Sequence, residues 1–235
     1  VLNQEDQYVN MRYMQKGELE GGFHFKNLFV PLTTAKAITF IAITGFLTYT
    51  NSLFGAFLSD DSAQIVENVL AHSLSNLRYF FMGGTFHSGG NTLIGLFYRP
   101  MLVTYFSLLW NIFGSSPFFF HFFQVTFHVV NALLLFKIFR HWFTLEIAFF
   151  LSLIFVVHPM NVEAVAWISA SGAVLSGLFG LAAFCLLMKK GNTSRETLVA
   201  LASLLISGLF QESGMLFILI IFVYKFLFNK ERWTQ

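Results

Sequence analysis

The chain has 235 residues, of which 56% are hydrophobic and 11% are charged, and its formal net charge is +2. A mean hydropathy of +0.66 excludes an ordinary water-soluble domain and indicates a multi-spanning membrane protein. Cys185 is the single cysteine, so neither an intrachain disulfide nor a thiolate metal site is available. We expect the lipid bilayer, and no nucleic acid, among the partners.

The chain divides by composition into a polar start, a long apolar module and a short polar end. Residues 1–34 are too polar to be a cleaved signal and are expected to form a cytoplasmic tail. Residues 35–229 are expected to form the transmembrane module. Residues 230–235 are expected to be a cytoplasmic end that is cut short.

Six apolar runs are candidate transmembrane helices. A bilayer core of about 30 Å requires roughly 20 helical residues. Three runs have that length and contain no Asp, Glu, Lys or Arg: residues 37–58, 116–136 and 164–188. Three weaker candidates are residues 142–161, 197–211 and 213–229. We therefore expect an all-α polytopic membrane protein with about six transmembrane helices.

Two further segments are expected to lie on the membrane surface. Residues 101–113 would extend only about 20 Å as a helix, which is too short to cross the bilayer. Pro100 suits the first position of that helix, and Gly114 suits the position after its end. Residues 62–77 place apolar and polar side chains on opposite sides of a helix. Both interfacial helices would belong to a large external loop at residues 59–115.

The distribution of basic residues supports this arrangement, because cytoplasmic loops collect Lys and Arg. Six crossings place nearly all the Lys and Arg residues at the inner face and leave only Arg78 and Arg99 outside. The outer side then holds seven charged residues: Asp60, Asp61, Glu67, Arg78, Arg99, Glu163 and Glu212.

Three of these residues lie next to the ends of predicted helices. Asp60 and Asp61 come after the first span, where a carboxylate can act as a general base or can cap a helix. Arg99 stands at the start of the surface helix, where its guanidinium matches a phosphate or contacts a lipid headgroup.

Two later turns add polar groups on the same side. The turn at residues 158–167 contains His158 and Glu163, and Glu163 can either serve a site or cap the following helix. Glu212 lies between two short apolar helices, where a buried carboxylate requires a partner. A polar stripe within one span is better explained by interhelical hydrogen bonds than by metal ligation. It consists of His121, Gln124, His128 and Asn131.

An ordered set of short motifs resembles the amino-terminal membrane module of the transmembrane, tetratricopeptide-repeat-containing O-mannosyltransferases and their bacterial relatives. More broadly, the chain is similar to GT-C glycosyltransferases. The motifs are Asp60-Asp61 with Asn68, Tyr98-Arg99-Pro100, Phe113-Gly114 with Pro117 and His121, and His158-Pro159 with Glu163-Ala164-Val165-Ala166. The chain departs from the family pattern at Val162, at residues 169–173 and at Gln211, and it contains no tetratricopeptide repeats.

The resemblance implies a polyprenyl-phosphate-linked sugar donor, an inverting transfer to an acceptor hydroxyl on a protein or glycan, and an active site on the external or luminal face. It implies a multi-pass protein of a bacterial inner or plasma membrane, or of the endoplasmic reticulum if the source is eukaryotic. A catalytically degenerate relative that acts as a membrane binding or assembly partner, or a transporter, is the alternative function.

The resemblance also implies roles for single residues. Asp60 is the first candidate for the general base, with Asp61 beside it, and Arg99 with Tyr98 is expected to bind the donor phosphate. His158, Glu163 and Glu212 are expected to shape the donor or acceptor site. No cofactor or metal site is assigned, and a divalent cation is left open.

Overall fold

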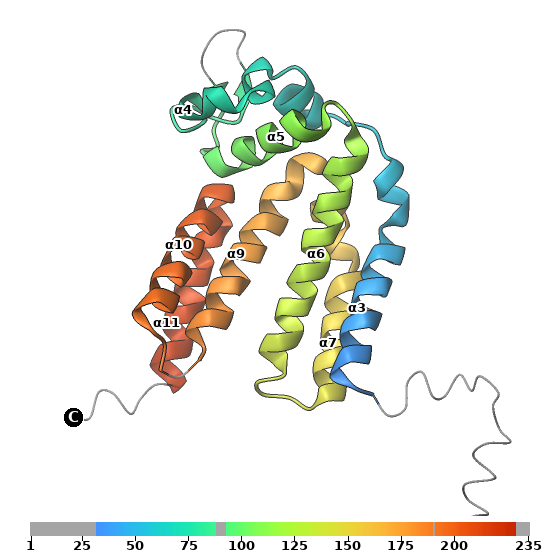
Figure 1. Cartoon of the computed structure of the whole chain (residues 1–235), viewed down its shortest axis with the longest axis vertical. Coiled ribbons are helices and arrows are strands. Elements are labelled where there is room, and N and C mark those ends of the chain that lie inside the picture. The colour runs from blue at the N-terminus through green and yellow to red at the C-terminus, as the bar shows by residue number, and fades with distance from the viewer. Residues whose placement is uncertain (1–31, 88–92, 190, 229–235) are drawn as a thin grey trace, which may run out of the picture.

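The computed structural model describes residues 32–87, 93–189 and 191–228. The expected tail at residues 1–34 lies almost entirely outside the described residues, and the expected end at residues 230–235 lies wholly outside them. Figure 1 shows a bundle of long helices that run along the same axis, with shorter elements across one end.

The bundle consists of helices that alternate in direction and are joined mostly by short connections. They are α3 (Thr34–Thr48), α6 (Pro117–Phe139), α7 (Leu145–Val157), α9 (Ser171–Leu187), α10 (Ser194–Phe210) and α11 (Leu216–Phe228). Buried apolar clusters join α3 with α6 and α7, and α6 with α9, α10 and α11.

Two of the expected transmembrane helices meet the requirements of length and composition. Pro117–Phe139 and Ile168–Leu187 have 23 and 20 residues with high hydropathy. A third is obtained if α7 and Pro159–Ala166, which are bent by 47° at their junction, are counted as one span. The chain is therefore a predominantly helical membrane protein in the described part, with two or three spans identified on this basis.

The first expected span is interrupted before its predicted end. Helix α3 ends at Thr48, and the chain continues as a 3₁₀ helix over Thr50–Phe54. The hydroxyl groups of Thr48 and Thr50 donate to backbone carbonyls one turn earlier, at 2.8 Å each. Such local hydrogen bonds compete with a regular helix, which explains the change of geometry in this polar stretch.

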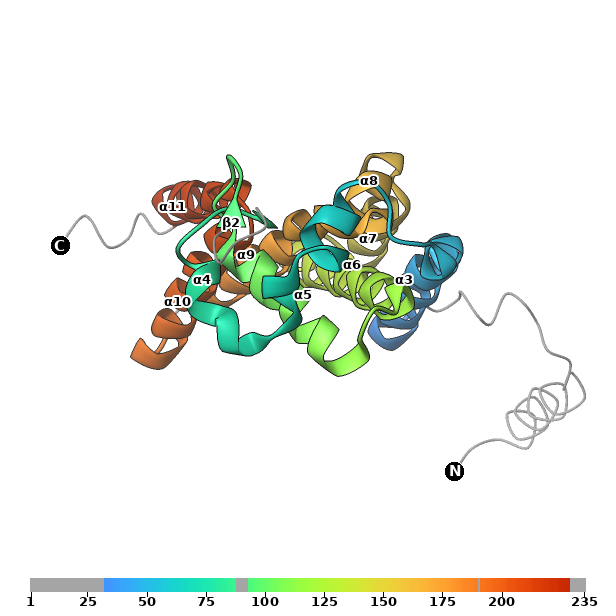
Figure 2. The ribbon, with the colours of Figure 1, turned by 90° about the horizontal axis from the view of Figure 1, so that it is seen from above.

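The predicted surface helix is present as α5 (Pro100–Phe113). It starts with Pro100 and ends at Gly114, whose φ of 63° favours glycine and whose N–H donates to the Trp110 carbonyl at 2.8 Å. Its buried face packs on α6 and α10 through Phe106, among other residues. Figures 1 and 2 show α5 lying across the helix ends and not among the helices.

The second expected surface helix, residues 62–77, is not continuous. The chain forms a π-helical turn (Ser62–Val66), two 3₁₀ turns (Val69–His72 and Leu74–Asn76) and the short helix α4 (Leu77–Phe80). Its expected division into a polar and an apolar side is also wrong.

The buried side chain of Asn68 explains the break in this segment. It donates to the Gln64 carbonyl at 3.1 Å and accepts from the Ala71 N–H at 3.3 Å, so it replaces helical hydrogen bonds. Gln64 and Asn68, expected on the polar side, are buried, as Ile65 and Leu70 of the apolar side are. We refer to residues 59–87 and 93–114 as the cap. The cap also contains the two short antiparallel strands β1 (Phe86–His87) and β2 (Leu93–Ile94), which are a small exception to the all-α class.

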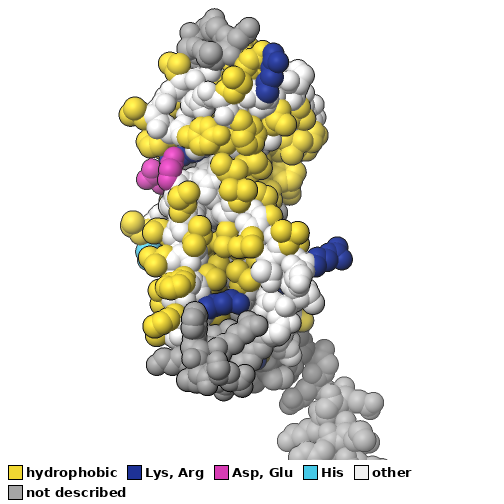
Figure 3. Space-filling model, turned by 90° about the vertical axis from the view of Figure 1, so that its left-hand side faces the viewer, with side chains coloured by type: hydrophobic (Ala, Val, Ile, Leu, Met, Phe, Trp, Pro, Cys, Tyr) yellow, Lys and Arg dark blue, Asp and Glu magenta, His cyan; other side chains and the backbone are white. Residues whose placement is uncertain are grey.

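The two ends of the bundle differ in charge. We call the end under the cap the site end, and the opposite end the basic end. Six of the described basic residues lie at the basic end: Lys36, Lys137, Arg140, Lys189, Arg195 and Lys225. On the side that carries α10 and α11, Figure 3 shows hydrophobic side chains over much of the surface between Asp or Glu side chains and a basic lower region.

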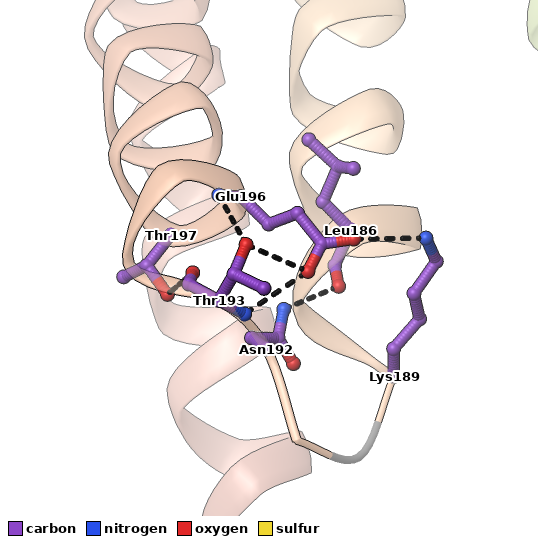
Figure 4. A network of polar contacts seen from close by, with 6 residues as sticks. All are labelled: Leu186, Lys189, Asn192, Thr193, Glu196 and Thr197. Atoms are coloured by element: carbon purple, nitrogen blue, oxygen red, sulfur yellow. Dashed lines mark hydrogen bonds and ion pairs between the residues drawn. The ribbon is translucent and has the colours of Figure 1, made fainter.

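The start of α10 at the basic end is fixed by a capping box. The Thr193 hydroxyl accepts from the Glu196 N–H at 3.2 Å, and the Glu196 carboxylate accepts from the Thr193 N–H at 3.0 Å (Figure 4). Lys189 forms an ion pair with Glu196 at 3.2 Å. The short connection from α9 to α10 is therefore held by polar contacts on both sides.

Candidate active site

Asp61 joins the cap to the start of α9. Its Oδ1 accepts from the Ser169 N–H at 2.7 Å and from the Ser169 hydroxyl, and its Oδ2 accepts from the Leu58 N–H at 3.0 Å. The side chain is 1% exposed. A buried carboxylate with several hydrogen-bond donors is fixed in place. Asp61 therefore acts as a tether between two segments that are 108 residues apart.

Asp60 has a different environment from its neighbour. It is half-buried, and its carboxylate accepts one long hydrogen bond, from the Ser59 hydroxyl at 3.4 Å. Ser59, directly before the two aspartates, has a φ of 49°, which is an unusual value for a residue other than glycine. Asp60 lines an open cavity, whereas the Asp61 side chain points into the protein.

Arg99 and Glu212 form an ion pair that connects the cap to the turn between α10 and α11. The Arg99 Nη2 atom lies 2.8 Å from Glu212 Oε2, and Nε lies 3.2 Å from both carboxylate oxygens. The guanidinium also stacks over the Phe97 ring at 4.4 Å. Partial burial raises the pKa of Glu212, but the Arg99 contacts and its own backbone N–H lower it, and the net pKa lies below the ordinary value.

The turn that carries Glu163 is held against the bundle by Gln124. The Gln124 Nε2 group donates to the Ala164 carbonyl at 2.6 Å and to the Trp167 carbonyl at 2.8 Å. This places the short helix α8 (Val162–Ala166) beside α6, with the Glu163 side chain exposed at the cavity.

These segments enclose one cavity of about 360 Å³ at the site end. Asp60, Arg99 and Glu163 all line it, although they come from three separate parts of the chain. Glu212 joins this group through Arg99. The cavity also has polar and aromatic walls that were not predicted as site residues: Gln64, Thr85, Phe86, Phe97 and Trp167. Nothing in the spacing of these residues marks them as members of a site.

Four predicted site residues do not line this cavity: Asp61, Glu212, Tyr98 and His158. The Tyr98 hydroxyl donates to the Phe81 carbonyl at 3.2 Å on the surface of the cap. The His158 Nδ1 atom accepts from the Met160 N–H at 3.2 Å and so caps the short 3₁₀ turn Pro159–Asn161. The structure therefore places Tyr98 and His158 near the site but gives each a local structural contact.

The polar stripe on α6 forms interhelical contacts, as expected. In addition to Gln124, the His128 Nε2 atom lies 3.2 Å from the Val156 carbonyl, and Asn131 donates to the Val174 carbonyl at 2.9 Å. His121 is buried, and its two ring nitrogens have no hydrogen-bond partner in the described part of the chain. The described residues contain no group of three or more His, Cys, Asp or Glu side chains placed to hold a metal ion.

A second cavity of about 460 Å³ adjoins the first. Ala164 and Ala173 line both, so the two spaces share a wall. The second cavity lies between α6, α9 and α11 and is predominantly apolar, with Leu181, Leu216 and Ile220 among its lining residues. The site end thus combines a polar cavity with an adjacent apolar one.

The fold and the cavity define a helical membrane protein with a charged site at one end of its bundle. Curated proteins similar to this chain carry one functional name. The chain is 31% identical to Protein O-mannosyl-transferase TMTC3 of Mus musculus over 63% of this chain and 16% of that protein. It is 35% identical to Protein O-mannosyl-transferase TMTC1 of Mus musculus over 65% of this chain and 17% of that protein. It is 29% identical to Protein O-mannosyl-transferase F38B6.6 of Caenorhabditis elegans over 77% of this chain and 27% of that protein.

The resemblance found from the sequence motifs is therefore confirmed: relatives of this chain are named protein O-mannosyl-transferases. The chain spans about a sixth to a quarter of the length of these relatives. No family model matches the chain, and no solved structure matches it significantly.

Proposed function

We propose that this chain forms the catalytic membrane module of an inverting glycosyltransferase. The module moves a mannose-like sugar from a polyprenyl-phosphate donor to a hydroxyl group of a protein acceptor. The observation that carries the proposal is the convergence of Asp60, Arg99 and Glu163 on one cavity. The names of the relatives supply the type of reaction and the class of acceptor.

The proposed orientation has six membrane crossings, with the site end external or luminal. Helix α3 and the following 3₁₀ helix together extend roughly 30 Å, enough for a bilayer core. The basic residues at the opposite end favour a cytoplasmic position for that end. Asp60, Arg99 and Glu163 then lie near the outer boundary of the membrane, where an acceptor from the aqueous phase and a lipid-linked donor meet.

Asp60 is the proposed general base. A base must reach the proton of the attacking hydroxyl, and Asp60 lines the cavity with its carboxylate almost free of other hydrogen bonds. Asp61 is unsuitable for this step because its oxygens already accept hydrogen bonds from Ser169 and Leu58. In the displacement, the acceptor oxygen forms the new bond to the sugar as its proton passes to Asp60, and the phosphate departs with the electrons of the broken bond.

Arg99 is the proposed partner of the donor phosphate. Glu212 engages the Nε and Nη2 atoms of Arg99, and Nη1 has no hydrogen-bond partner in the described ranges. Arg99 thus keeps one donor edge for a ligand, while the carboxylates of Asp60 and Glu163 repel negative charge in the same cavity. These features suit a phosphate diester with a single negative charge better than a more highly charged pyrophosphate. The adjoining apolar cavity suits the prenyl chain.

The replacement Asp60→Asn tests the proposal. We expect sugar transfer to fall by at least about 100-fold, because a general base typically contributes 10²- to 10⁴-fold. The measurement is transfer of radiolabelled mannose from polyprenyl-phosphate mannose to a protein acceptor, in membranes that contain the full-length protein. Equal membrane insertion of the variant is checked in the same samples.

Glu67→Gln is the matched control. It removes a carboxylate from the same loop, but Glu67 is exposed and does not line the cavity. This variant is expected to retain transfer. Unchanged transfer in Asp60→Asn would exclude Asp60 as the base, and absence of transfer in the unaltered protein would favour a degenerate relative that only binds or assembles.

A further inference from the structure

A third cavity lies at the basic end, far from the site cavity along the bundle. Its volume is about 550 Å³, within the range of about 300–1,000 Å³ that is usual for ligand pockets. Four cationic side chains from three helices and their connections line it: Lys137, Arg140, Lys189 and Lys225. His141 also contributes to its wall.

Two of these four cations already have partners. Lys189 forms the ion pair with Glu196 at 3.2 Å that Figure 4 shows. The Arg140 Nη1 group donates to the Phe143 carbonyl at 3.1 Å, and Arg140 acts electrostatically on Glu146. Lys137 and Lys225, in contrast, make no hydrogen bond or ion pair with any residue of the described part of the chain. The cavity therefore has two ammonium groups available for an anion.

The other walls of the cavity are apolar and aromatic. Tyr224 is one of the lining residues, and its ring centroid lies 5.2 Å from that of Phe228. Its hydroxyl donates to the Met188 carbonyl at 3.3 Å. Leu187 and Phe228 also line the cavity. Aromatic side chains with a polar edge are typical of the boundary between membrane and water, so the cavity has a cationic side and a side suited to an acyl chain.

We propose that this cavity binds the headgroup of an anionic phospholipid. The phosphate lies between Lys137 and Lys225, and the first part of an acyl chain lies against Tyr224 and Phe228. A basic cavity between membrane helices at the cytoplasmic side is a recognised form of lipid recognition. The apolar wall selects a lipid over a soluble phosphate, which would leave that wall in water. The proposal depends on the membrane position of the bundle and not on sugar transfer.

The test is a titration of the purified full-length protein, in a neutral detergent, with phosphatidylglycerol that carries a fluorescent acyl chain. The double variant Lys137→Gln/Lys225→Gln is expected to weaken binding by about thirty-fold, since each basic residue near an anionic lipid contributes on the order of 1 kcal/mol. Phosphatidylcholine with the same label is expected to bind poorly to both proteins. Lys137→Arg/Lys225→Arg, which keeps the charges, is expected to retain binding within about threefold.

The matched control is Lys36→Gln/Arg195→Gln. It removes the same charge from the same end, but neither residue lines the cavity. This control is expected to bind phosphatidylglycerol as the unaltered protein does. Equal losses in the two Gln double variants would overturn the proposal in favour of general surface attraction. Competition by glycerol 1-phosphate at the same concentration as the lipid would also overturn it and would assign a soluble phosphate.

Discussion

At the scale of single residues, the two adjacent aspartates have different environments. Asp61 is buried against Ser169, and Asp60 faces the site cavity. The sequence identified the pair but left open which carboxylate serves which purpose. That choice depends on the turn at Ser59 and on a contact across 108 residues, and neither follows from local spacing.

The tether predicts a loss of stability in Asp61→Asn. The amide nitrogen would replace one carboxylate oxygen and leave a buried donor unpaired, at either Leu58 or Ser169, which costs about 1–3 kcal/mol. The measurement is thermal unfolding of the detergent-solubilised protein. Ser169→Ala, which keeps the backbone N–H, is expected to have a smaller effect, and Asp60→Asn is expected to have almost none. A thermal transition unchanged in Asp61→Asn would show that the tether does not stabilise the fold.

The predicted partner for Glu212 is also a result at this scale. A buried carboxylate between two apolar helices was expected to need a counter-charge. Arg99 supplies the counter-charge from 113 residues away, but the Glu212 side chain is exposed and not buried. The general requirement could be derived from the cost of an unpaired charge. The identity of the partner could not, because it depends on how the cap folds over α10.

At the scale of elements, the helices with strong local signals were predicted best. Pro100 and Gly114 fixed the bounds of α5, and the long apolar run gave α6. The segment at residues 62–77 was predicted wrongly because hydrophobic periodicity alone takes no account of Asn68. That side chain forms backbone contacts that divide the segment into short turns.

The close contact between the Glu212 turn and α10 predicts the effect of Gly214→Ala. A Cβ atom at Gly214 would lie 2.4 Å from the Ser207 carbonyl oxygen, so the turn would have to move away from α10. We expect a loss of about 1–3 kcal/mol in stability, by analogy with other overpacked positions, and weaker sugar transfer because Glu212 moves with the turn. Thermal unfolding and the mannose-transfer assay measure these two effects.

Gly208→Ala is the matched control for that change. A Cβ atom there would meet only the Met215 side chain, at an ordinary 3.5 Å. Since alanine also favours helix over glycine, this variant is expected to be as stable as the unaltered protein or slightly more stable. Similar destabilisation of both variants would contradict the prediction, because the loss of stability at position 214 would then not come from its close approach to the Ser207 carbonyl.

At the scale of the whole molecule, composition gave the class and the charge pattern gave the opposed ends of the bundle. Helix lengths alone identify two or three spans. The shorter helices α10 and α11 pack beside α9 in the same bundle, and this packing is a tertiary property that a hydropathy window does not register.

The proposed topology predicts the labelling of introduced cysteines in a Cys185→Ala background. Leu96 and Met160 are 97% and 80% exposed at the site end, and Arg195 is exposed at the basic end. Leu96→Cys and Met160→Cys are expected to react with a membrane-impermeant maleimide from the same side. When the maleimide is added on that same side, Arg195→Cys is expected to react only after the membrane has been permeabilised. Labelling of positions 96 and 160 from opposite compartments would contradict the arrangement.

The long sequence separation of the two contacts that frame the site has a consequence for biosynthesis. Asp61 meets Ser169 across 108 residues, and Arg99 meets Glu212 across 113. At a translation rate of roughly 5–20 residues per second, each early residue emerges about 5–20 seconds before its partner. During that interval the Asp61 carboxylate and the Arg99 guanidinium of the nascent chain have no bonding partners. The cavity can therefore acquire its shape only after α9 and the turn beyond α10 have been synthesised.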